Sequence, residues 1–369
     1  MTDTNRLRRR GRALGASFVV TLAGASACKT TQAPLLALAL TLVVGGCGAA
    51  QPTTSEPPRP NVESAGKSSQ PVALALDGAH PERIKLRWQE EIGGRGVAVA
   101  VERKSARVAA VVEGSPVKLY DFWSGKSAGV SATCTDVLRG GVFLLQGRLI
   151  VVCSDRLEQY RVQGMKELPS PSLAESRATA ASLAWPWLAV GHHDGVLRLY
   201  NLQSEERVEI PVPGPPVDVK SLALSKDGST LAVAWVQGSI WWWKVAEPEH
   251  PHPLTRYESE SDALTFDPSG RWLAEEGEKS LTSVWSFDGE PNRRYQRKHG
   301  AWIKRMHFTR DGKWLLRAGS HGVDLVEVAG EHSLSLTSGL VEDVGLDPDQ
   351  TSFAAVDRKG RLSLWMSRP

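Results

Sequence analysis

Carboxylate side chains gather at two places in the second half of the chain. The first group is Glu258, Glu260 and Asp262, and the second is Glu342 and Asp343. Closely spaced carboxylates can bind a cation or a basic partner, whereas an ordinary surface keeps them as a solvated acidic rim. We therefore treat these five residues as a candidate partner-binding rim.

His192, His193 and Asp194 form a second polar group that could hold a metal ion. Adjacent residues at a strand end point to opposite faces, so the two histidines are poorly placed to chelate together. Asp194-Gly195 is sufficiently explained as a turn. We expect no metal here.

A basic group follows about one hundred residues later and consists of Arg293, Arg294, Arg297 and Lys298. These side chains could bind anionic headgroups or a partner carboxylate. They also fit an exposed edge strand, which uses charge to prevent aggregation.

The sequence lacks the patterns that mark common active sites. It has no Gly-x-Ser-x-Gly elbow, phosphate-binding loop, His-Glu-x-x-His motif or Cys-x-x-Cys pair. We therefore expect a protein that is not an enzyme, with no catalytic residues and no cofactor.

The formal net charge of +3 is unevenly distributed along the chain. Residues 1–46 hold six of the 44 basic residues and one of the 41 acidic residues. The remainder therefore carries 38 basic and 40 acidic residues, a net charge of −2. Because a nucleic-acid binder needs a basic surface, we expect no nucleic-acid partner.

Residues 1–46 have the features of a signal peptide. An arginine-rich stretch precedes a ten-residue apolar run at 35–44, which suits a signal peptide and is short for a membrane helix. The motif Val44-Gly45-Gly46-Cys47 resembles the bacterial lipobox, in which the cysteine is lipidated and becomes the first residue. Cys28 is a competing site, and a plain cleaved signal or an uncleaved leader are further alternatives.

Residues 47–82 are rich in proline and serine and poor in large apolar side chains. Such a segment cannot bury enough surface to fold and is typical of a tether. We expect Cys47 to be the lipid attachment site. The resemblance to bacterial lipoproteins, in which Asp after the lipidated cysteine favours retention in the inner membrane, implies the outer membrane here because Gly48 follows Cys47, with the body facing the periplasm or the cell surface.

Residues 83–369 repeat seven times with a period of about 41 residues. One landmark is the apolar residue that opens the second strand of each unit: Val108, Ile150, Leu188, Leu231, Leu273, Leu315 and Phe353. The other is a large residue near the end of the third strand: Tyr120, Tyr160, Tyr200, Trp243, Trp285, Val326 and Trp365. Four short strands at this period predict an all-β fold, a seven-bladed β-propeller of four-stranded blades.

The recurrent aromatic residues are expected to pack between blades. Six of them occupy the third-strand position: Tyr120, Tyr160, Tyr200, Trp243, Trp285 and Trp365. Alternation along the strand sends Trp241 and Trp243 to one side and Trp242 to the other, so at least two of these three should pack between blades. An exposed Trp242 would be a binding anchor.

The stretch GHHDGVLRLYN at residues 191–201 resembles the WD repeat, with Tyr200-Asn201 in place of the usual Trp-Asp. Tyr120-Asp121 is a second near match. The copies are degenerate, since Asp194 is the only turn aspartate and His299 the only histidine at the family's Gly-His position. The resemblance implies a propeller that binds other proteins, without identifying the binding residues.

The resemblance also locates the two cysteines of the body. Cys134 falls at the family's Gly-His position and Cys153 ends the second strand of the same blade, so both lie on one face. Outside the cytoplasm a disulfide is expected to replace the missing histidine contact. The alternative is a pair of buried free thiols.

The last unit contains only three strands, so we expect residues 84–88, which alternate apolar and charged side chains, to add the fourth and close the ring.

We expect a membrane-anchored interaction scaffold in the bacterial envelope. The alternatives are a periplasmic propeller enzyme or ligand binder with a channel metal site, and an intracellular WD-repeat scaffold whose start is misassigned.

Overall fold

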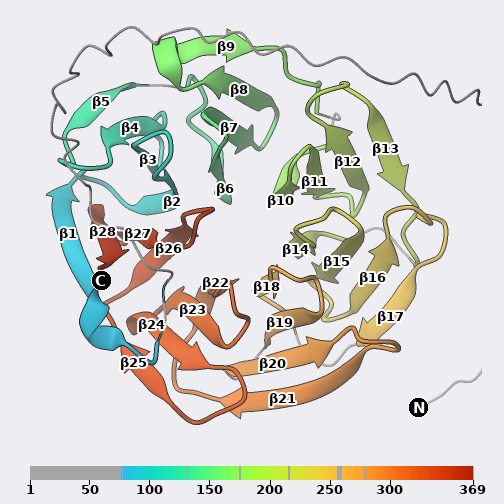
Figure 1. Ribbon diagram of the computed structural model, residues 1–369. Helices are drawn as coiled ribbons and strands as arrows, with labels where there is room; N and C mark the ends of the chain where they lie inside the picture. The colour runs from blue at the N-terminus through green and yellow to red at the C-terminus, as the bar shows by residue number, and fades with distance from the viewer. Residues whose placement is uncertain are drawn as a thin grey trace, which may run out of the picture. The chain divides into compact units, whose positions relative to one another are not determined.

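The computed structural model describes residues 76, 78–130, 132–173, 176–214, 217–255, 260–277 and 280–368. The predictions for the signal peptide, Cys47, most of the tether and Glu258 lie outside these residues. Within them, the strands form seven four-stranded antiparallel sheets arranged around a centre, as Figure 1 shows. The predicted seven-bladed β-propeller is confirmed.

Each of blades 1 to 4 uses four consecutive strands, and the first strand of each blade lies at the centre (Figure 1). Blade 1 contains β2 (Gly96–Glu102), β3 (Arg107–Val112), β4 (Lys118–Asp121) and β5 (Ser127–Val130). Blade 2 contains β6 (Val137–Leu145), β7 (Arg148–Cys153), β8 (Leu157–Arg161) and β9 (Lys166–Leu168), with the short 3₁₀ helix η2 (Gln163–Met165) before β9. Blade 3 contains β10 (Ala178–Ala184), β11 (Trp187–His192), β12 (Leu197–Asn201) and β13 (Arg207–Ile210). Blade 4 contains β14 (Val219–Leu224), β15 (Thr230–Trp235), β16 (Ile240–Lys244) and β17 (His252–Thr255).

Blades 5 and 6 follow the same order, and blade 7 departs from it. Blade 5 contains β18 (Ala263–Phe266), β19 (Trp272–Gly277), β20 (Leu281–Ser286) and β21 (Asn292–Lys298). Blade 6 contains β22 (Ile303–Phe308), β23 (Trp314–Gly319), β24 (Gly322–Glu327) and β25 (Ser333–Ser335). Blade 7 joins β26 (Val341–Leu346), β27 (Ser352–Asp357) and β28 (Arg361–Ser367) to β1 (Ile84–Glu91), which follows the 3₁₀ helix η1 (Pro81–Arg83).

The first strand of the chain closes the ring, as predicted. β1 pairs with β28 in antiparallel register from Ile84 opposite Ser367 to Glu91 opposite Arg361. The chain contacts the propeller before β1 begins, because Leu76 is buried between blades 6 and 7. Pairing the first strand with the last leaves no open sheet edge between the two ends of the ring.

Seven hydrophobic clusters hold the propeller together, one in each gap between neighbouring blades. Five of the predicted aromatic residues are buried in these gaps: Tyr120, Tyr160, Tyr200, Trp243 and Trp285. Trp365 packs against the cluster of blades 6 and 7 and is partly buried. Blade 6 has Val326 at this position, and a cavity of about 550 Å³ lies beside it, between blades 5 and 6.

The two sequence landmarks are cross-strand partners in six of the seven blades, for example Leu188 with Tyr200 and Phe353 with Trp365. Blade 2 is the exception. There Tyr160 pairs with Leu149, which is the first apolar residue of β7, and the landmark Ile150 faces the next blade gap. The landmark was placed one residue too far along the chain, and in a strand one residue moves a side chain to the opposite face.

All three tryptophans of β16 pack between blades. Trp243 and Trp241 contact the cluster shared with blade 3, and Trp242 contacts the cluster shared with blade 5. Trp242 also stacks on His252, with ring centroids 4.5 Å apart. The predicted alternation is therefore present, and Trp242 is not an exposed anchor.

Candidate interaction face

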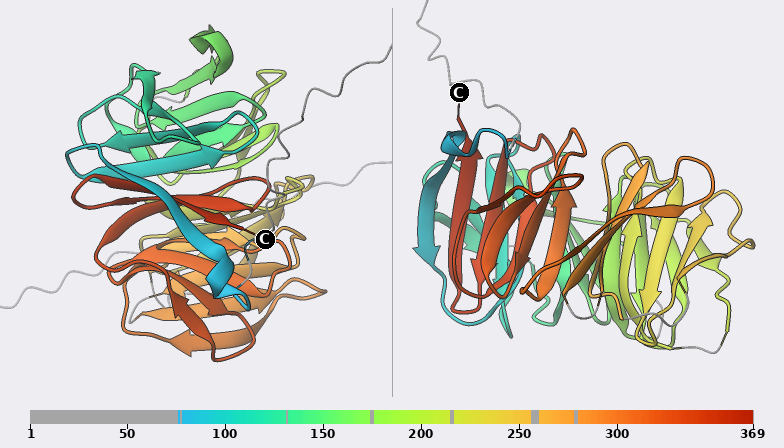
Figure 2. Two further views of the ribbon diagram at one scale, coloured as in Figure 1. Left: turned by 60° about the vertical axis from the view of Figure 1, so that its left-hand side comes forward. Right: turned by 90° about the horizontal axis from the view of Figure 1, so that it is seen from below.

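The inner strands begin on one face of the propeller, which we call the mouth face; Figure 2 shows the strands of the blades running between the two faces. Glu342, the second residue of β26, is fully buried there. Its Oε1 lies 3.1 Å from Arg95 Nε and its Oε2 lies 3.2 Å from Arg139 Nη1, while the Lys304 ammonium also pairs with Oε2. These partners come from blades 1, 2 and 6, so one carboxylate joins four blades.

The ion pairs decide the charge of Glu342. Burial by itself raises the pKa of this carboxyl, but the hydrogen bond and charge of Lys304, with Arg95 and Arg139, outweigh burial and lower the pKa below its usual value. Burial lowers the pKa of Lys304, and the nearby charges of Arg139 and Arg95 act in the same direction. The ionised carboxylate of Glu342 therefore offsets the electrostatic repulsion among Lys304, Arg95 and Arg139.

Asp343 forms a second buried pair beside it. Its Oδ1 accepts a hydrogen bond from Arg305 Nε at 3.0 Å, and its Oδ2 accepts one from the Val99 amide at 2.8 Å. Burial raises the pKa of Asp343, and the Arg305 charge and the amide only partly oppose that rise. The residue ties β26 to the inner strands of blades 6 and 1.

Arg305 also reaches blade 2. A Cβ atom at Gly140 would lie 0.9 Å from Arg305 Nη2, and Gly140 has φ +61°, so only glycine fits at this point. The register of β6 against β7 shifts between Val137 and Val142, and this irregularity contains both Arg139 and Gly140. The bulge therefore presents one arginine to Glu342 and leaves room for another.

These observations correct the predicted acidic rim. Glu342 and Asp343 lie within β26, not in a loop, and both are buried. Four cationic side chains surround the two carboxylates, so this part of the mouth face carries an excess of two positive charges. Buried carboxylates without such partners would be too costly to keep ionised.

The first acidic group lies on the same face but has a different environment. Lys220, near the start of β14, pairs with both Glu260 and Asp262, the latter at 2.9 Å. Asp262 Oδ2 also accepts a 2.7 Å hydrogen bond from the indole Nε1 of Trp302. Glu260 and Asp262 therefore link blades 4, 5 and 6.

Trp302 is the most exposed large apolar side chain among the described residues, at 58%. It is nevertheless fixed at several points. Its indole bonds Asp262, its backbone amide donates to Ser320 Oγ at 2.9 Å, and the Lys304 ammonium lies 5.5 Å from the ring centroid. A rigid, amphipathic aromatic ring on a charged face is the usual form of an interaction anchor.

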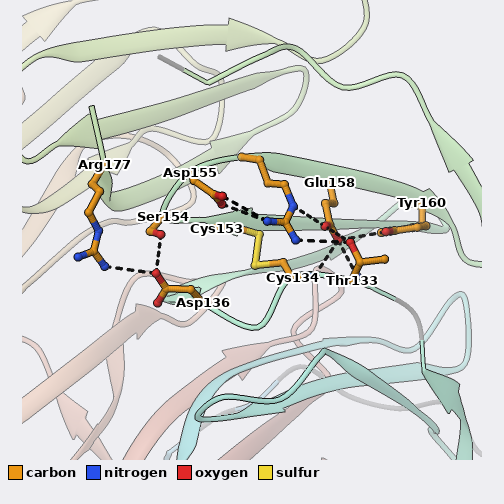
Figure 3. A network of polar contacts seen from close by, with 10 residues as sticks. Thr133, Cys134, Asp136, Cys153, Ser154, Asp155, Glu158, Tyr160 and Arg177 are labelled. Carbon is orange, nitrogen blue, oxygen red and sulfur yellow. Dashed lines mark hydrogen bonds and ion pairs between the residues drawn. A yellow bond between two sulfur atoms is a disulfide. The ribbon is translucent and has the colours of Figure 1, made fainter. Parts of the chain in front are cut away.

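Blade 2 carries a further polar network beside this face, drawn in Figure 3. Cys134 and Cys153 are joined by a disulfide, with Cα atoms 6.4 Å apart. Asp136, in the same loop as Cys134, accepts a hydrogen bond from Ser154 Oγ at 2.5 Å and pairs with Arg177 of blade 3 at 3.3 Å. The disulfide and these contacts fix the loop that leads into the bulged β6.

Glu158 is the centre of a second group of polar contacts on the other side of the disulfide (Figure 3). It accepts hydrogen bonds from the Thr133 amide at 2.9 Å, from Arg156 Nε at 2.9 Å and from the Tyr160 hydroxyl at 3.0 Å. Burial raises the pKa of Glu158, but the Thr133, Arg156 and Tyr160 hydrogen bonds outweigh it and lower the pKa. Burial, followed by the hydrogen bond to this carboxylate, raises the pKa of Tyr160 to about 12.

The centre of the propeller contains a cavity of about 290 Å³ lined by all seven inner strands. Its walls are mostly aliphatic and aromatic, with Arg305 and Asp343 among the few charged lining residues. His307 also lines it, and burial together with the Arg305 charge lowers the pKa of His307 to about 4. The neutral ring donates from Nε2 to the Val344 carbonyl at 2.9 Å.

The histidine pair does not form a metal site. His192 is buried, with Nδ1 2.8 Å from the Ser176 carbonyl, whereas the exposed His193 pairs with Asp218 of blade 4. Asp194 accepts a hydrogen bond from the Val196 amide, as a turn residue does. Across the described ranges, no group of three or more His, Cys, Asp or Glu side chains is arranged to hold a metal ion.

The predicted basic group lies on β21, the outer strand of blade 5. Arg293 sits over the Trp285 ring, 5.4 Å from its centroid, and Arg297 donates to the Glu331 carbonyl at 2.7 Å. Arg294 and Lys298 are exposed. These positions match an outer strand protected by charge.

Sequence reasoning missed Arg95, Arg139, Lys304, Arg305 and Trp302. A signal for three of them exists, because Asp262 and Trp302, Lys304 and Glu342, and Arg305 and Asp343 are 40, 38 and 38 residues apart. That is one repeat period, the spacing that places residues at equivalent points of adjacent blades.

Comparison with known proteins does not assign the chain to a family. No protein-family model matches the sequence, and no curated protein matches it significantly. Among the residues that the structure describes, no helix has the length and apolar character needed to cross a membrane.

Proposed function

We propose that this protein is an interaction scaffold that docks a partner protein on its mouth face, with Trp302 as the anchor. The observation that carries the proposal is the exposed indole of Trp302, which is held by Asp262, Ser320 and Lys304 before any partner arrives. Pre-organisation of this kind lowers the entropy cost of binding.

The charges beside Trp302 indicate the chemistry of the partner. The Glu342 cluster has more cations than carboxylates, and the side chains of Arg95 and Arg139 remain 41% and 46% exposed. Guanidinium groups bind carboxylates with good geometry. We therefore propose a partner segment that places an apolar side chain on Trp302 and a carboxylate toward Arg95 and Arg139.

The test is crosslinking from native membranes followed by identification of partners and measurement of the dissociation constant. Trp302→Ala should weaken binding of a reproducible partner by about tenfold or more. The matched control is Leu86→Ala, which removes an exposed apolar side chain from β1 at the outer edge. If Trp302→Ala and Leu86→Ala bind the partner with the same dissociation constant, the mouth face is not the docking surface.

We further propose that Cys47 is lipidated and anchors the propeller to the envelope membrane. The lipobox resemblance and the apolar run before it support this. Cys47→Ser should move the protein from the membrane fraction to the soluble fraction, while Cys28→Ser, at the competing site, should leave it membrane-bound. The reverse result would assign the anchor to Cys28.

A further inference from the structure

Basic side chains gather on the face opposite the mouth face, where the inner strands end. We call it the far face. A concavity of about 640 Å³ lies there between the β2–β3 loop, the β6–β7 turn and the end of β8. Its lining residues include four cations, Lys104, Arg107, Arg148 and Arg161, and no carboxylate.

Two of these cations face each other directly. Arg148 in β7 is the cross-strand partner of Arg161 in β8, and Arg161 is in turn the partner of Lys166 in β9. Partners of this kind point to the same side of a sheet, and like charges in that position are destabilising. A row of three cations across three strands therefore favours the binding of an anion.

Two nearby carboxylates already have partners within the propeller. Asp121 pairs with Arg107 at 3.5 Å, and the buried Glu102 accepts a 3.0 Å hydrogen bond from the Gly147 amide. No described carboxylate forms an ion pair with Lys104, Arg148 or Arg161. Three positive charges of the concavity therefore lack an ion-pair partner among the described residues, although the Arg148 guanidinium also lies over the Trp185 ring, 5.0 Å from its centroid.

The chain enters the propeller on this same face. The Leu76 amide donates to the Gln350 carbonyl at 2.8 Å, in the loop between β26 and β27. Asp347 of that loop accepts a 3.0 Å hydrogen bond from the Arg103 amide, next to Lys104. The segment that leads from Cys47 thus joins the propeller on the same face as the basic concavity, in the gap between blades 6 and 7.

We propose that the far face binds an anionic phospholipid surface, with the concavity receiving a headgroup phosphate between Arg148 and Arg161. The membrane setting rests on the proposed lipid anchor. Guanidinium groups match phosphate oxygens in charge and geometry, and clustered basic residues add to membrane affinity when a lipid chain is also present. The mouth face, at the other end of the strands, then points away from the membrane toward a partner.

The test uses the full chain with Cys47→Ser, so that no covalent lipid contributes. Binding is measured by co-sedimentation with phosphatidylcholine vesicles, with and without about one third phosphatidylglycerol. The double variant Arg148→Gln/Arg161→Gln is compared with Arg293→Gln/Arg294→Gln, which removes the same charge from β21. Because the two variants share the N-terminal segment, its own basic residues cancel in the comparison.

We expect the Arg148/Arg161 variant to lose about tenfold in affinity for the anionic vesicles and the Arg293/Arg294 variant to keep it. Higher salt should weaken the wild-type interaction. Equal binding by both variants would overturn the proposal. Displacement by millimolar inorganic phosphate without any preference for anionic vesicles would also overturn it, in favour of a soluble phosphate ligand. Neither result depends on the lipid anchor or on a partner protein, so failure here is distinguishable from failure of the proposed function.

Discussion

The two faces of the propeller use charge in opposite ways. On the mouth face, Glu342 and Asp343 are buried and each carries a cationic partner from another blade. On the far face, Arg148 and Arg161 lie directly opposite each other without a carboxylate. The first arrangement holds blades together, whereas the second has a cost in stability that a bound anion would offset.

This difference shows that charge density alone does not mark a binding surface. The cluster around Glu342 and Asp343 on the mouth face has six charged groups, and most of them pair with one another. The groups that remain exposed there are the Trp302 ring and the half-exposed Arg95 and Arg139. The basic concavity of the far face has fewer charged groups, and among the described residues its Lys104, Arg148 and Arg161 have no carboxylate partner. Function is therefore better inferred from the charges that remain uncompensated.

Removing the central carboxylate of the mouth face should have the largest effect. Glu342→Gln leaves Lys304 buried beside two arginines, and breaking such a pair from one side is predicted to lower the free energy of unfolding by about 3 kcal/mol. Urea denaturation measures the change. The matched control is Glu260→Gln, a half-exposed carboxylate on the same face, which should cost less than about 1 kcal/mol. Equal effects would mean that the Glu342 cluster contributes no more than a surface pair.

The disulfide of blade 2 should have an effect of similar size. It closes a loop with a sequence separation of 19 residues, so Cys134→Ala/Cys153→Ala should lower the free energy of unfolding by about 3 kcal/mol. Iodoacetamide should label neither residue until a reductant is added. Immediate labelling of the native, unreduced protein would show that the two thiols are free. The reduced wild type and the double variant should have the same free energy of unfolding.

The network around Glu158 should make stability depend on pH. Its pKa is lowered in the folded chain, so its contribution is complete above the unfolded value of about 4.3 and disappears as the pH falls through the folded pKa. Glu158→Gln should therefore cost about 2 kcal/mol near pH 7 and progressively less in acid. Thermal unfolding at several pH values measures this, and a constant difference between the two proteins would contradict it.

Much of the fold was predictable because the repeat period is a property of the sequence. Landmarks such as Leu231 and Trp243 recur at the correct spacing and are cross-strand partners in the structure. The error in blade 2 has a local cause, since the short turn after Cys153 brings Tyr160 opposite Leu149 rather than Ile150. A repeat period of about 41 residues locates each strand, but it does not determine the pairing of two strands to within one residue.

The site was less predictable, because acidic residues are visible in the sequence and their partners are not. Glu342 meets Arg95 across a separation of 247 residues, which only closure of the ring brings together. The bulge that holds Arg139 and Gly140 is longer than the one-residue register shifts at the same place in blades 1, 3, 4, 6 and 7, so the repeat does not predict it. Residues one period apart, such as Asp262 and Trp302, were within reach of sequence reasoning.

The smallest expected effect has the opposite sign. Arg161 lies between Arg148 and Lys166 on neighbouring strands, so Arg161→Gln should relieve repulsion and raise the free energy of unfolding by up to about 1 kcal/mol at low salt. Arg294→Gln, an exposed arginine of β21, should change it by less than about 0.5 kcal/mol. Salt screens repulsion, so the gain should shrink in 1 M salt. A loss of stability in Arg161→Gln would mean that this row of cations is compensated in the folded protein, and the contrast between the two faces would then not hold.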